Sequence, residues 1–371
     1  MNILVTGGAG FIGSHLVDEL AKKGHGVRIF DNLDPQVHPD GKKPDHLNPE
    51  AEFILGDVRD RDALKKALEG QEIVFHEASA VGVGQSQYKL EYYVGVNVMG
   101  TANLLDILVN DKHKVQKVVV AASMSSYGEG NFECKKCGIV RPPLRPESQM
   151  AKSDWNNYCP ECGEAVKPVP TDEKARQNCN SIYAITKQNQ EQMVLNIGQT
   201  YRLPSVALRY FNVYGPRQSL SNPYTGVAAI FMSRIKNGHR PVVYEDGLQT
   251  RDFVSVHDIV RANICAMENP KADYGTFNIG RGELLTIKSI AETLAKLYGR
   301  EDIRPEVLNK FRKGDVRHCY ADTAAAREIL GFEAKTAFED GMKDLIEWAK
   351  EAEADDRFEA AAGELKEKGL I

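Results

Sequence analysis

The sequence predicts an α/β protein built on a Rossmann-type, doubly wound parallel sheet, with a smaller α/β lobe and a cysteine-rich insertion. Three observations support this fold. Short apolar runs alternate with helical patterns through the first half of the chain, as in βαβ units. The first run ends in a glycine-rich turn at residues 7–13 that opens a helix. Two Cys-x-x-Cys pairs interrupt this succession between residues 123 and 183.

Composition and charge are those of a globular protein. The chain has 371 residues, 42% of them hydrophobic, which is enough for a large core. Its 47 basic and 52 acidic residues give a formal net charge of −5, so we expect no general affinity for nucleic acid or for anionic membranes. The sequence runs from Met1 directly into a strand, and no later segment approaches about 18 uncharged apolar residues. We therefore expect a cytoplasmic protein.

Strands and helices are expected in a regular order. The first strand leads through the glycine turn into a helix that contains Leu16, Val17 and Leu20. A second long helix is expected at 183–197, after the cysteine segment. The seven expected strands of the sheet are residues 2–6, 27–30, 53–55, 73–75, 118–121, 206–211 and 276–279.

The remaining segments complete the expected domain organisation. The tail alternates charge with alanine and is expected to form a solvated helix. Residues after the sixth strand mix short strands with helices, as a smaller lobe does. The expected parts are a sheet domain (1–130 and 171–215, with about 253–279), a cysteine insert (131–170), a substrate lobe (216–252 and 280–348) and a charged tail (349–371).

The glycine turn has the spacing of a dinucleotide-binding loop. Its small residues let the backbone approach a pyrophosphate, and the helix N-terminus supplies N–H donors and a positive dipole. Asp31, at the end of the next strand, would accept hydrogen bonds from the adenosine ribose and repel a 2′-phosphate, which favours NAD over NADP. A plain tight turn is the alternative for the loop, and a strand-end cap is the alternative for Asp57. The residues predicted to bind the cofactor here are Gly7, Gly10, Phe11, Ile12, Gly13, Asp31, Asn32, Asp57 and Val58.

Tyr183 and Lys187 are the predicted centre of the chemistry. On a helix, residues four apart share a face, so the Lys187 ammonium can stand beside the Tyr183 phenol. A nearby ammonium and a cationic nicotinamide ring both favour the phenolate and would lower the pKa of Tyr183 from its reference value of about 10. Tyr183 is therefore a candidate general base. A Tyr and a Lys at this spacing also occur as an ordinary amphipathic pair, so the glycine loop is needed to support the assignment.

The glycine spacing together with Tyr183-Ala-Ile-Thr-Lys187 resembles the extended short-chain dehydrogenase/reductase superfamily over roughly residues 1–348, apart from the insert. The resemblance implies that Ser123 hydrogen-bonds the reacting hydroxyl. In superfamily members that dehydrate a sugar, the next two positions resemble Asp-Glu, and nucleotide-sugar decarboxylases keep the Glu. Here they are Met124 and Ser125. Without that carboxylate, dehydratase and decarboxylase functions lack an evident catalyst, and reversible oxidation at one carbon is expected.

The same resemblance extends to a nucleotide diphosphate sugar as substrate. It implies that Asn97 lies near the nicotinamide ribose and that two arginines clamp the phosphates, for which the guanidinium fork is suited. A surface salt bridge is the alternative for each arginine. Tyr244 would stack on the base or serve as a core aromatic. The residues assigned to substrate are Ser125, Asn212, Tyr244, Arg251 and Arg312.

The four paired cysteines predict a structural zinc site. Cys134 and Cys137 are separated from Cys159 and Cys162 by residues 138–158, and each pair ends in a turn glycine. Four thiolates fill a tetrahedral shell, so this Zn²⁺ would fold a loop and take no part in catalysis. A disulfide pair is the alternative. Cys179, Cys265 and Cys319 have no partner pattern.

These observations lead to one expected function and several rivals. The stretch from Arg209 to Val227, with a cysteine-bearing insert, resembles nucleotide-sugar 4-epimerases, among them dTDP-L-rhamnose 4-epimerases. The resemblance implies tightly bound NAD, a dTDP- or UDP-linked sugar and a homodimer. UDP-glucose/galactose or UDP-glucuronate 4-epimerisation and an NAD(P)H-dependent 4-ketosugar reductase are the enzymatic alternatives. A nucleotide-sensing or nucleic-acid-binding ribbon is disfavoured, because residues 131–170 balance six Lys/Arg with five Asp/Glu.

Overall fold

The apolar runs of the sequence form one parallel sheet of seven strands, and all seven expected strands are present. The computed structural model describes residues 1–371. The sheet order β14-β9-β5-β4-β1-β2-β3 reverses between β1 and β4, and in such sheets ligands bind at the carboxyl ends of the strands beside the reversal. The strands are β1 (Asn2–Thr6), β2 (Gly26–Asp31), β3 (Glu52–Leu55), β4 (Ile73–His76), β5 (Lys117–Ser123), β9 (Ser205–Tyr210) and β14 (Thr276–Ile279).

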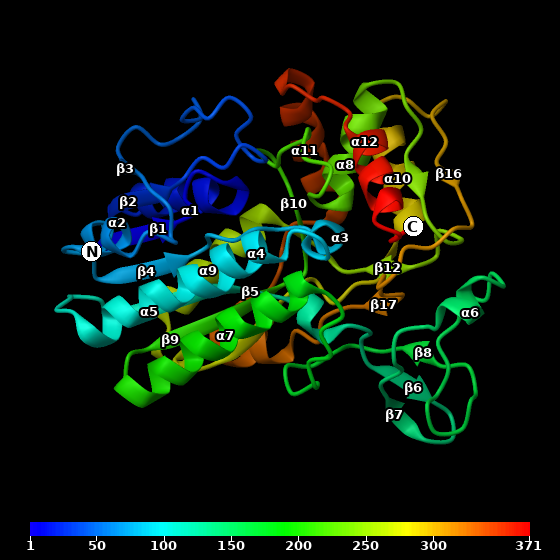
Figure 1. Ribbon diagram of the computed structural model, residues 1–371, viewed down its shortest axis with the longest axis horizontal. Helices are drawn as coiled ribbons and strands as arrows, with labels where there is room; N and C mark the ends of the chain where they lie inside the picture. The colour runs from blue at the N-terminus through cyan, green and yellow to red at the C-terminus, as the bar shows by residue number, and fades with distance from the viewer.

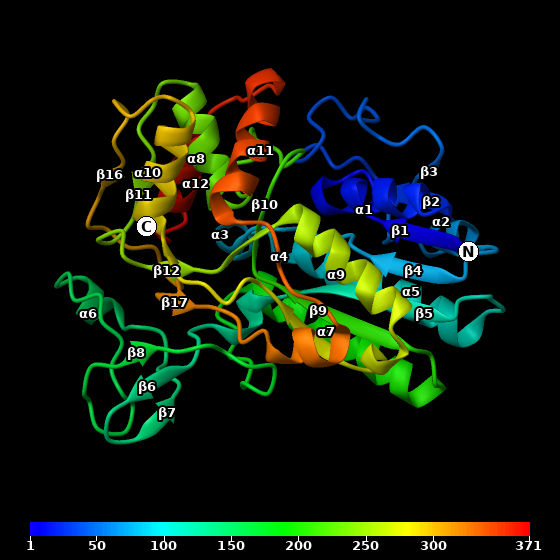
Figure 2. The same ribbon diagram turned by 180° about the vertical axis from the view of Figure 1, so that it is seen from behind.

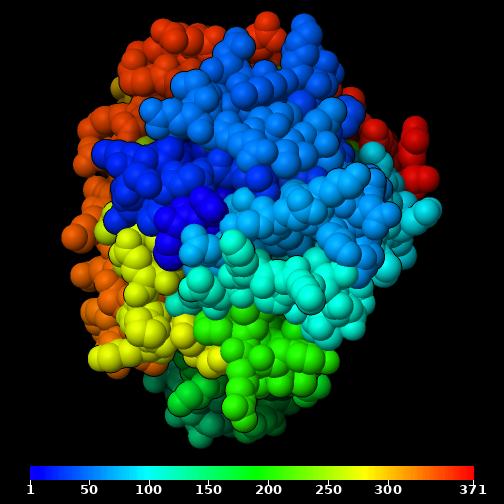
Figure 3. Space-filling model, turned by 90° about the vertical axis from the view of Figure 1, so that its left-hand side faces the viewer, coloured from blue at the N-terminus to red at the C-terminus, as the bar shows by residue number.

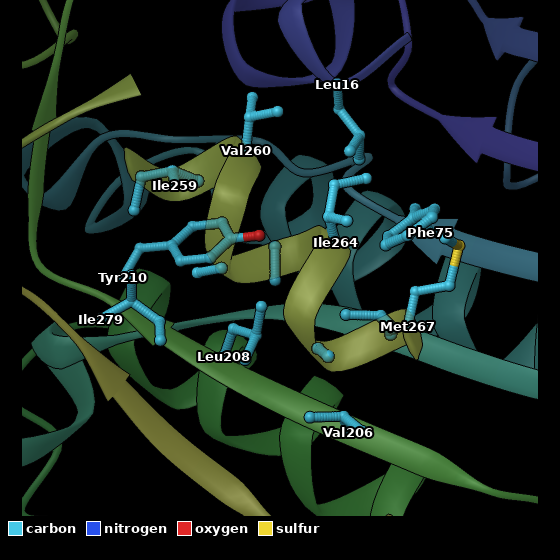
Figure 4. Packing of buried hydrophobic residues seen from close by; sticks show 14 of the residues in the cluster. Leu16, Phe75, Val206, Leu208, Tyr210, Ile259, Val260, Ile264, Met267 and Ile279 are labelled. Atoms are coloured by element: carbon cyan, nitrogen blue, oxygen red, sulfur yellow. The ribbon is translucent and has the colours of Figure 1, made fainter. Parts of the chain in front are cut away.

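Helices cover both faces of this sheet (Figures 1 and 2), which accounts for the unbroken apolar character of the strands. Successive side chains alternate between two hydrophobic clusters: Ile3 and Val5 belong to one, and Leu4 to the other. Figure 4 shows the first cluster, where β9 packs against a long helix. One face carries α1 (Phe11–Lys22), α9 (Val256–Glu268), η3 (Pro270–Ala272) and η4 (Ala326–Leu330), and the other carries α2 (Arg61–Leu68), α5 (Gly100–Asn110) and α7 (Ile182–Tyr201).

One helical run in this half is long and apolar enough to cross a membrane by length and composition alone. It spans Leu90–Asn110, with a mean hydropathy of 1.2, and comprises α4 (Leu90–Tyr93), the π-helix η1 (Val94–Met99) and α5. Half of it is buried, because Tyr93, Leu104 and Leu108 pack into the second cluster beside α2 and α7. This is the position of a crossover helix in a βαβ unit, and such core helices pass the same test.

A second lobe packs beside the carboxyl ends of the strands, around a separate hydrophobic cluster. Its short strands pair in three small groups, and its helices lie together at one end of the molecule (Figures 1 and 2). The sheet half forms the opposite end, and it dominates the side view in Figure 3. The lobe elements are α8 (Val227–Lys236), α10 (Ile287–Leu297) and α11 (Phe338–Glu351), with β10 (Asn212–Tyr214) on β13 (Phe253–Ser255), β11 (Val242–Val243) on β16 (Glu306–Val307), and β12 (Thr250–Arg251) between β15 (Leu285–Thr286) and β17 (His318–Cys319).

The C-terminal tail is not a solvated helix, which corrects the sequence expectation. Helix α12 (Phe358–Glu367) packs against both halves, with Ala361 and Leu365 buried. The Glu364 carboxylate accepts hydrogen bonds from Tyr88 of the sheet half, at 2.7 Å, and from Tyr224 at 2.6 Å. The alternation of charge and alanine hides an apolar stripe at a spacing of three to four residues, and this stripe is the face that packs.

The cysteine insert is a small unit of its own, at the lower right of Figure 1. Three short antiparallel strands form it, in the order β7-β6-β8. The two ends of the insert meet, since the Asn131 N–H donates to Thr171 Oγ1 at 3.0 Å and Val169 N–H donates to the Asn131 carbonyl at 2.9 Å. Its elements are β6 (Phe132–Cys134), β7 (Gly138–Val140), α6 (Glu147–Met150) and β8 (Lys167–Pro168); the short helices α3 (Val83–Ser86) and η2 (Met124–Tyr127) complete the sheet half.

Candidate active site

One cavity of about 600 Å³ lies between the sheet half and the second lobe. It runs from the glycine loop at the carboxyl edge of the sheet to the short strands of the lobe, so both ends of the predicted site open into the same space. The four cysteines and Asn97 do not line it. The predicted residues that do are Gly7, Gly10, Phe11, Ile12, Gly13, Asp31, Asn32, Asp57, Val58, Ser123, Ser125, Tyr183, Lys187, Asn212, Tyr244, Arg251 and Arg312.

The three glycines of the loop differ in how strongly the surrounding protein atoms exclude a side chain. Gly7 has a φ of +71°, and a Cβ there would lie 2.7 Å from the Ala78 nitrogen. A Cβ on Gly13 would lie 2.2 Å from the Gly7 carbonyl oxygen, so the helix can pack this close only with glycine. Gly10 is less constrained by protein atoms, since its nearest neighbour is the Gly7 oxygen at 3.3 Å. Because Gly10 lines the cavity at the start of α1, the loop fits a phosphate near the helix N-terminus.

Asp31 lies at the end of β2 and ties the glycine loop to the following turn. Its two carboxylate oxygens accept the Ala9 and Leu33 N–H groups, each at 2.9 Å. Burial raises the pKa of Asp31, and these two backbone hydrogen bonds oppose the rise. Asp57 is engaged by Arg59 and Asn32, which donate to one of its oxygens at 2.6 and 2.9 Å. Asp57 Oδ1 also accepts the Arg59 N–H at 2.8 Å, so this side chain closes the turn after β3 while the residue lines the cavity.

Tyr183 is held at the start of α7. Ser181 caps this helix by accepting the Ala184 N–H, and the Tyr183 N–H, which has no partner within the helix, donates to Ser86 Oγ at 3.0 Å. Lys187 lies one turn further, and its ammonium donates to Gln190 Oε1 at 2.9 Å and to Ser79 Oγ at 3.3 Å. These contacts fix both predicted catalytic groups on a rigid element.

The electrostatics of this pair differ from the sequence expectation. Burial raises the pKa of Tyr183, and a hydrogen bond with Ser123 opposes the rise. Burial lowers the pKa of Lys187 to about 8, against the opposing charge of Glu77. The side chains alone thus do not favour the Tyr183 phenolate, because desolvation outweighs the hydrogen bond with Ser123. Ser123 in turn accepts a hydrogen bond from Ser125 Oγ at 2.9 Å, so both hydroxyls belong to one network.

Asn97 lies behind the cavity wall, and its place near the nicotinamide ribose stays a prediction. It is fully buried, and its side chain bonds the Ala80 N–H and carbonyl at 2.8 and 3.1 Å and Thr186 Oγ1 at 2.9 Å. The amide therefore fastens the segment after β4 to α7. Ser79 and Ala80 of that segment line the cavity, so Asn97 shapes the site without facing it.

Glu77 is a cavity residue that sequence reasoning missed. It directly follows β4, beside the glycine loop, and its Oε1 accepts a hydrogen bond from Tyr210 at 2.8 Å. Burial raises the pKa of Glu77 to about 7, against the effects of Tyr210 and of the Lys187 charge. A carboxyl group is thus present in the cavity even though positions 124 and 125 carry none. Its place after a strand at the sheet's carboxyl edge is the signal that could have identified it.

The lobe end of the cavity carries the groups assigned to the substrate. The Arg312 guanidinium lies over the Tyr244 ring, 4.8 Å from its centroid. Arg251 is held by backbone carbonyls, including that of Val316 at 2.6 Å. Three residues that line this space each have a buried amide oxygen without a protein partner. These oxygens are Asn212 Oδ1, Gln218 Oε1 and Gln249 Oε1; the two glutamines were not among the predicted site residues.

The cysteine cluster lies apart from the cavity. The four Sγ atoms of Cys134, Cys137, Cys159 and Cys162 are all within 4.8 Å of one another, and none of the seven cysteines forms a disulfide. The Cys137 and Lys136 N–H groups donate toward the Cys134 sulfur and lower its pKa to about 7. Tetrahedral Zn²⁺ with bonds of about 2.3 Å sets sulfurs about 3.8 Å apart, so the donor set fits this ion.

Comparisons with known proteins match this geometry. The NAD dependent epimerase/dehydratase family matches residues 3–153 and 159–280. A dTDP-L-rhamnose 4-epimerase of Burkholderia thailandensis is 35% identical over 353 residues, covering 93% of this chain and 94% of that protein.

Solved structures resemble the fold of this chain over similar lengths. A UDP-glucose 4-epimerase of Thermotoga maritima, solved with UDP-glucose, has a TM-score of 0.77 and 34% identity, covering 94% of this chain and 99% of that one. A UDP-glucuronic acid 4-epimerase of Bacillus cereus, solved with its UDP-sugar and NAD, has a TM-score of 0.76 and 27% identity over the same shares. From its sequence, its sheet and its relatives, this chain belongs to the NAD-dependent epimerase/dehydratase family.

Proposed function

We propose that the protein inverts the C4 hydroxyl of a nucleoside-diphosphate sugar, with NAD bound throughout the reaction. The observation that carries this proposal is the single cavity that joins the glycine loop, Tyr183 and the arginines of the lobe. A dinucleotide at the loop and a sugar diphosphate at Arg251 and Arg312 would meet beside Tyr183. Relatives described as 4-epimerases, over nearly their whole lengths, support the choice of reaction.

The protein groups take separate roles in this proposal. Tyr183 accepts the proton of the C4 hydroxyl, and Ser123 orients that hydroxyl by hydrogen bonding. NAD, when bound, supplies a hydride acceptor whose cationic ring also favours the Tyr183 phenolate. Lys187 would hold the nicotinamide ribose by hydrogen bonding and keeps a positive charge near the phenol. Turning of the 4-keto sugar within the cavity and return of the hydride to its other face complete the inversion.

The sugar and the base form the finer part of the proposal. We propose dTDP-L-rhamnose or a UDP-hexose as the substrate, because a relative at 35% identity and a solved structure at 34% identity are described with these compounds. UDP-glucuronate, found in a solved structure at 27% identity, is the alternative. We also propose a homodimer, by family resemblance, and a cytoplasmic location. Light scattering measures the oligomeric state.

We also propose that the four cysteine sulfurs hold one structural Zn²⁺. The insert has only a four-residue buried hydrophobic cluster, two members of which are the cysteines Cys134 and Cys159. Such a small core stabilises little by itself, and a closed thiolate shell would supply the missing stability. Metal analysis of protein that has never met a chelator tests this.

The test of the reaction is incubation of the purified protein with UDP- and dTDP-sugars, with C4 inversion followed by NMR. Substrate deuterated at C4 should keep its label, because the hydride leaves and returns within one site. A 4-ketosugar reductase would instead exchange its cofactor in each cycle, so NAD released into solution in step with product would favour that rival. Loss of the deuterium to solvent would exclude the proposed mechanism.

A further inference from the structure

Arg145 connects the cysteine insert to the second lobe through buried contacts. Both Nη atoms donate to the Glu245 carboxylate at 2.9 Å, and Nη2 also donates to the Asp315 carbonyl at 3.2 Å. The two side chains are 2% and 3% exposed. Bidentate pairing of this kind fixes orientation as well as distance.

Glu245 lies at the bend of the turn that follows β11. Its φ is +53°, a left-handed conformation that a non-glycine residue adopts only when its surroundings hold it. Its N–H donates to the Lys310 carbonyl at 2.7 Å, and its carboxylate also accepts Arg317 at 2.7 Å. Arg145 and Arg317 thus both pair with the Glu245 carboxylate. The residue immediately before it is Tyr244, which faces the cavity.

Asp315 makes the second connection. Its backbone carbonyl accepts Arg145, while its carboxylate accepts Arg312 Nε at 2.8 Å. Arg312 then lies over the Tyr244 ring. One guanidinium from the insert therefore contacts the two segments that carry the cavity's aromatic ring and the arginine beside it.

No residue of the insert lines the cavity, so any effect of the insert on a ligand must pass through such contacts. A buried ion pair is weak as a source of stability, since desolvation of the two charges offsets much of their attraction. Its bidentate geometry does, however, fix the position of one segment relative to the other. Tyr183 and Lys187 lie on α7 in the sheet half, and neither contacts Arg145 or Glu245.

We propose that the cysteine insert is a structural part of the nucleotide end of the site, with Arg145 as the positioning residue that sets Tyr244 and Arg312. This inference rests on the proposed function, because it assumes that the nucleoside diphosphate binds at the lobe end. Loss of Arg145 leaves Glu245 paired with Arg317 alone and frees both cavity segments to shift. Nucleotide affinity falls, whereas hydride transfer and cofactor binding do not change.

The test compares Arg145→Met with Arg141→Met in the protein that carries its cofactor. Arg141 belongs to the same insert but bonds only Asn131 within it, at 2.8 Å, so it controls for loss of one positive charge. Calorimetric titration with UDP and with dTDP measures affinity, steady-state kinetics separate KM from kcat, and denaturation releases NAD for assay. We expect Arg145→Met to raise Kd and KM about 5- to 150-fold, with kcat changed less than about threefold and NAD content unchanged.

Equal diphosphate affinity in folded Arg145→Met and wild type overturns the inference while leaving the proposed function intact. Failure of the wild-type protein to bind either diphosphate overturns the proposed function itself. If Arg145→Met does not fold, Arg145→Lys decides, since it keeps the charge and loses the fork. Weaker diphosphate binding by Arg145→Lys supports the positioning role, and unchanged binding shows that Arg145 serves only stability.

Discussion

The phenol of Tyr210, at the end of β9, donates its hydrogen to the Glu77 carboxyl at the end of β4, at 2.8 Å. Asn263 of α9 donates to the same phenol oxygen at 2.7 Å. Two strands and a helix are thus joined by one polar chain that ends in the cavity beside Lys187. Glu77 and Lys187 shift each other's pKa, so this chain sets the charge near the reacting atoms.

Glu77→Gln should change how stability depends on pH. Burial raises the folded pKa of Glu77 from 4.5 to about 7. Between those values the unfolded chain releases the proton and the folded chain keeps it, so the carboxyl makes stability fall as pH rises from 4.5 to about 7. Glu77→Gln should lack this decline, so its stability relative to the wild type should increase as pH rises from 4.5 to about 7. Denaturant midpoints at several pH values measure it, with exposed Glu91→Gln as the control; parallel curves for wild type and Glu77→Gln would contradict the assignment.

Tyr183→Phe should fold and retain cofactor but lose epimerisation by about 10²- to 10⁴-fold, because removal of a general base has this effect. Tyr201→Phe is the matched control, since Tyr201 lies at the exposed end of the same helix. NMR detection of C4 inversion measures activity, and NAD release on denaturation measures cofactor content. Turnover by Tyr183→Phe close to that of Tyr201→Phe would remove Tyr183 from the mechanism.

Asp31→Ala should weaken NAD binding far more than NADP binding. The carboxylate would bond the ribose of NAD, and its negative charge would repel a 2′-phosphate. It also accepts the Ala9 N–H, so Asp31→Asn, which keeps an oxygen acceptor, separates loss of charge from collapse of the loop. Titration of cofactor-free protein gives both affinities, with exposed Asp40→Ala as the control. NADP as the main species bound to the wild type would show the opposite preference.

Cys134→Ser combined with Cys159→Ser should abolish zinc content and lower the melting temperature. A serine hydroxyl is a poor substitute for a thiolate ligand, so the closed shell is lost. Cys265→Ser is the control, because Cys265 lies on α9 outside the cluster. Bound NAD should remain, since none of the four cysteines lines the cavity. Zinc that survives in the double variant, or cofactor lost from a variant that is still folded, would contradict the structural role.

Local pattern was enough to predict the strands, the glycine loop and the cysteine cluster, because short apolar runs and ligand spacing are encoded over a few residues. The contacts that shape the cavity are of another kind. Arg145 and Glu245 are 100 residues apart, and Glu77 and Tyr210 are 133 apart, so only the fold brings them together. Asn97 shows the same limit, since the sequence did not indicate that its side chain fastens the segment after β4 to α7.

The hydrogen bond between Asn131 and Thr171 marks the point at which the insert could be removed or transferred by protein engineering. Because its two ends already bond each other, a short turn between residues 130 and 172 would close the chain without moving β5 or α7. Such a deletion would leave Glu245 paired with Arg317 alone. A graft of the insert into a relative that lacks one would need an acidic residue in the recipient, because Arg145 would otherwise be buried without its partner. The transferable unit is therefore the insert together with position 245.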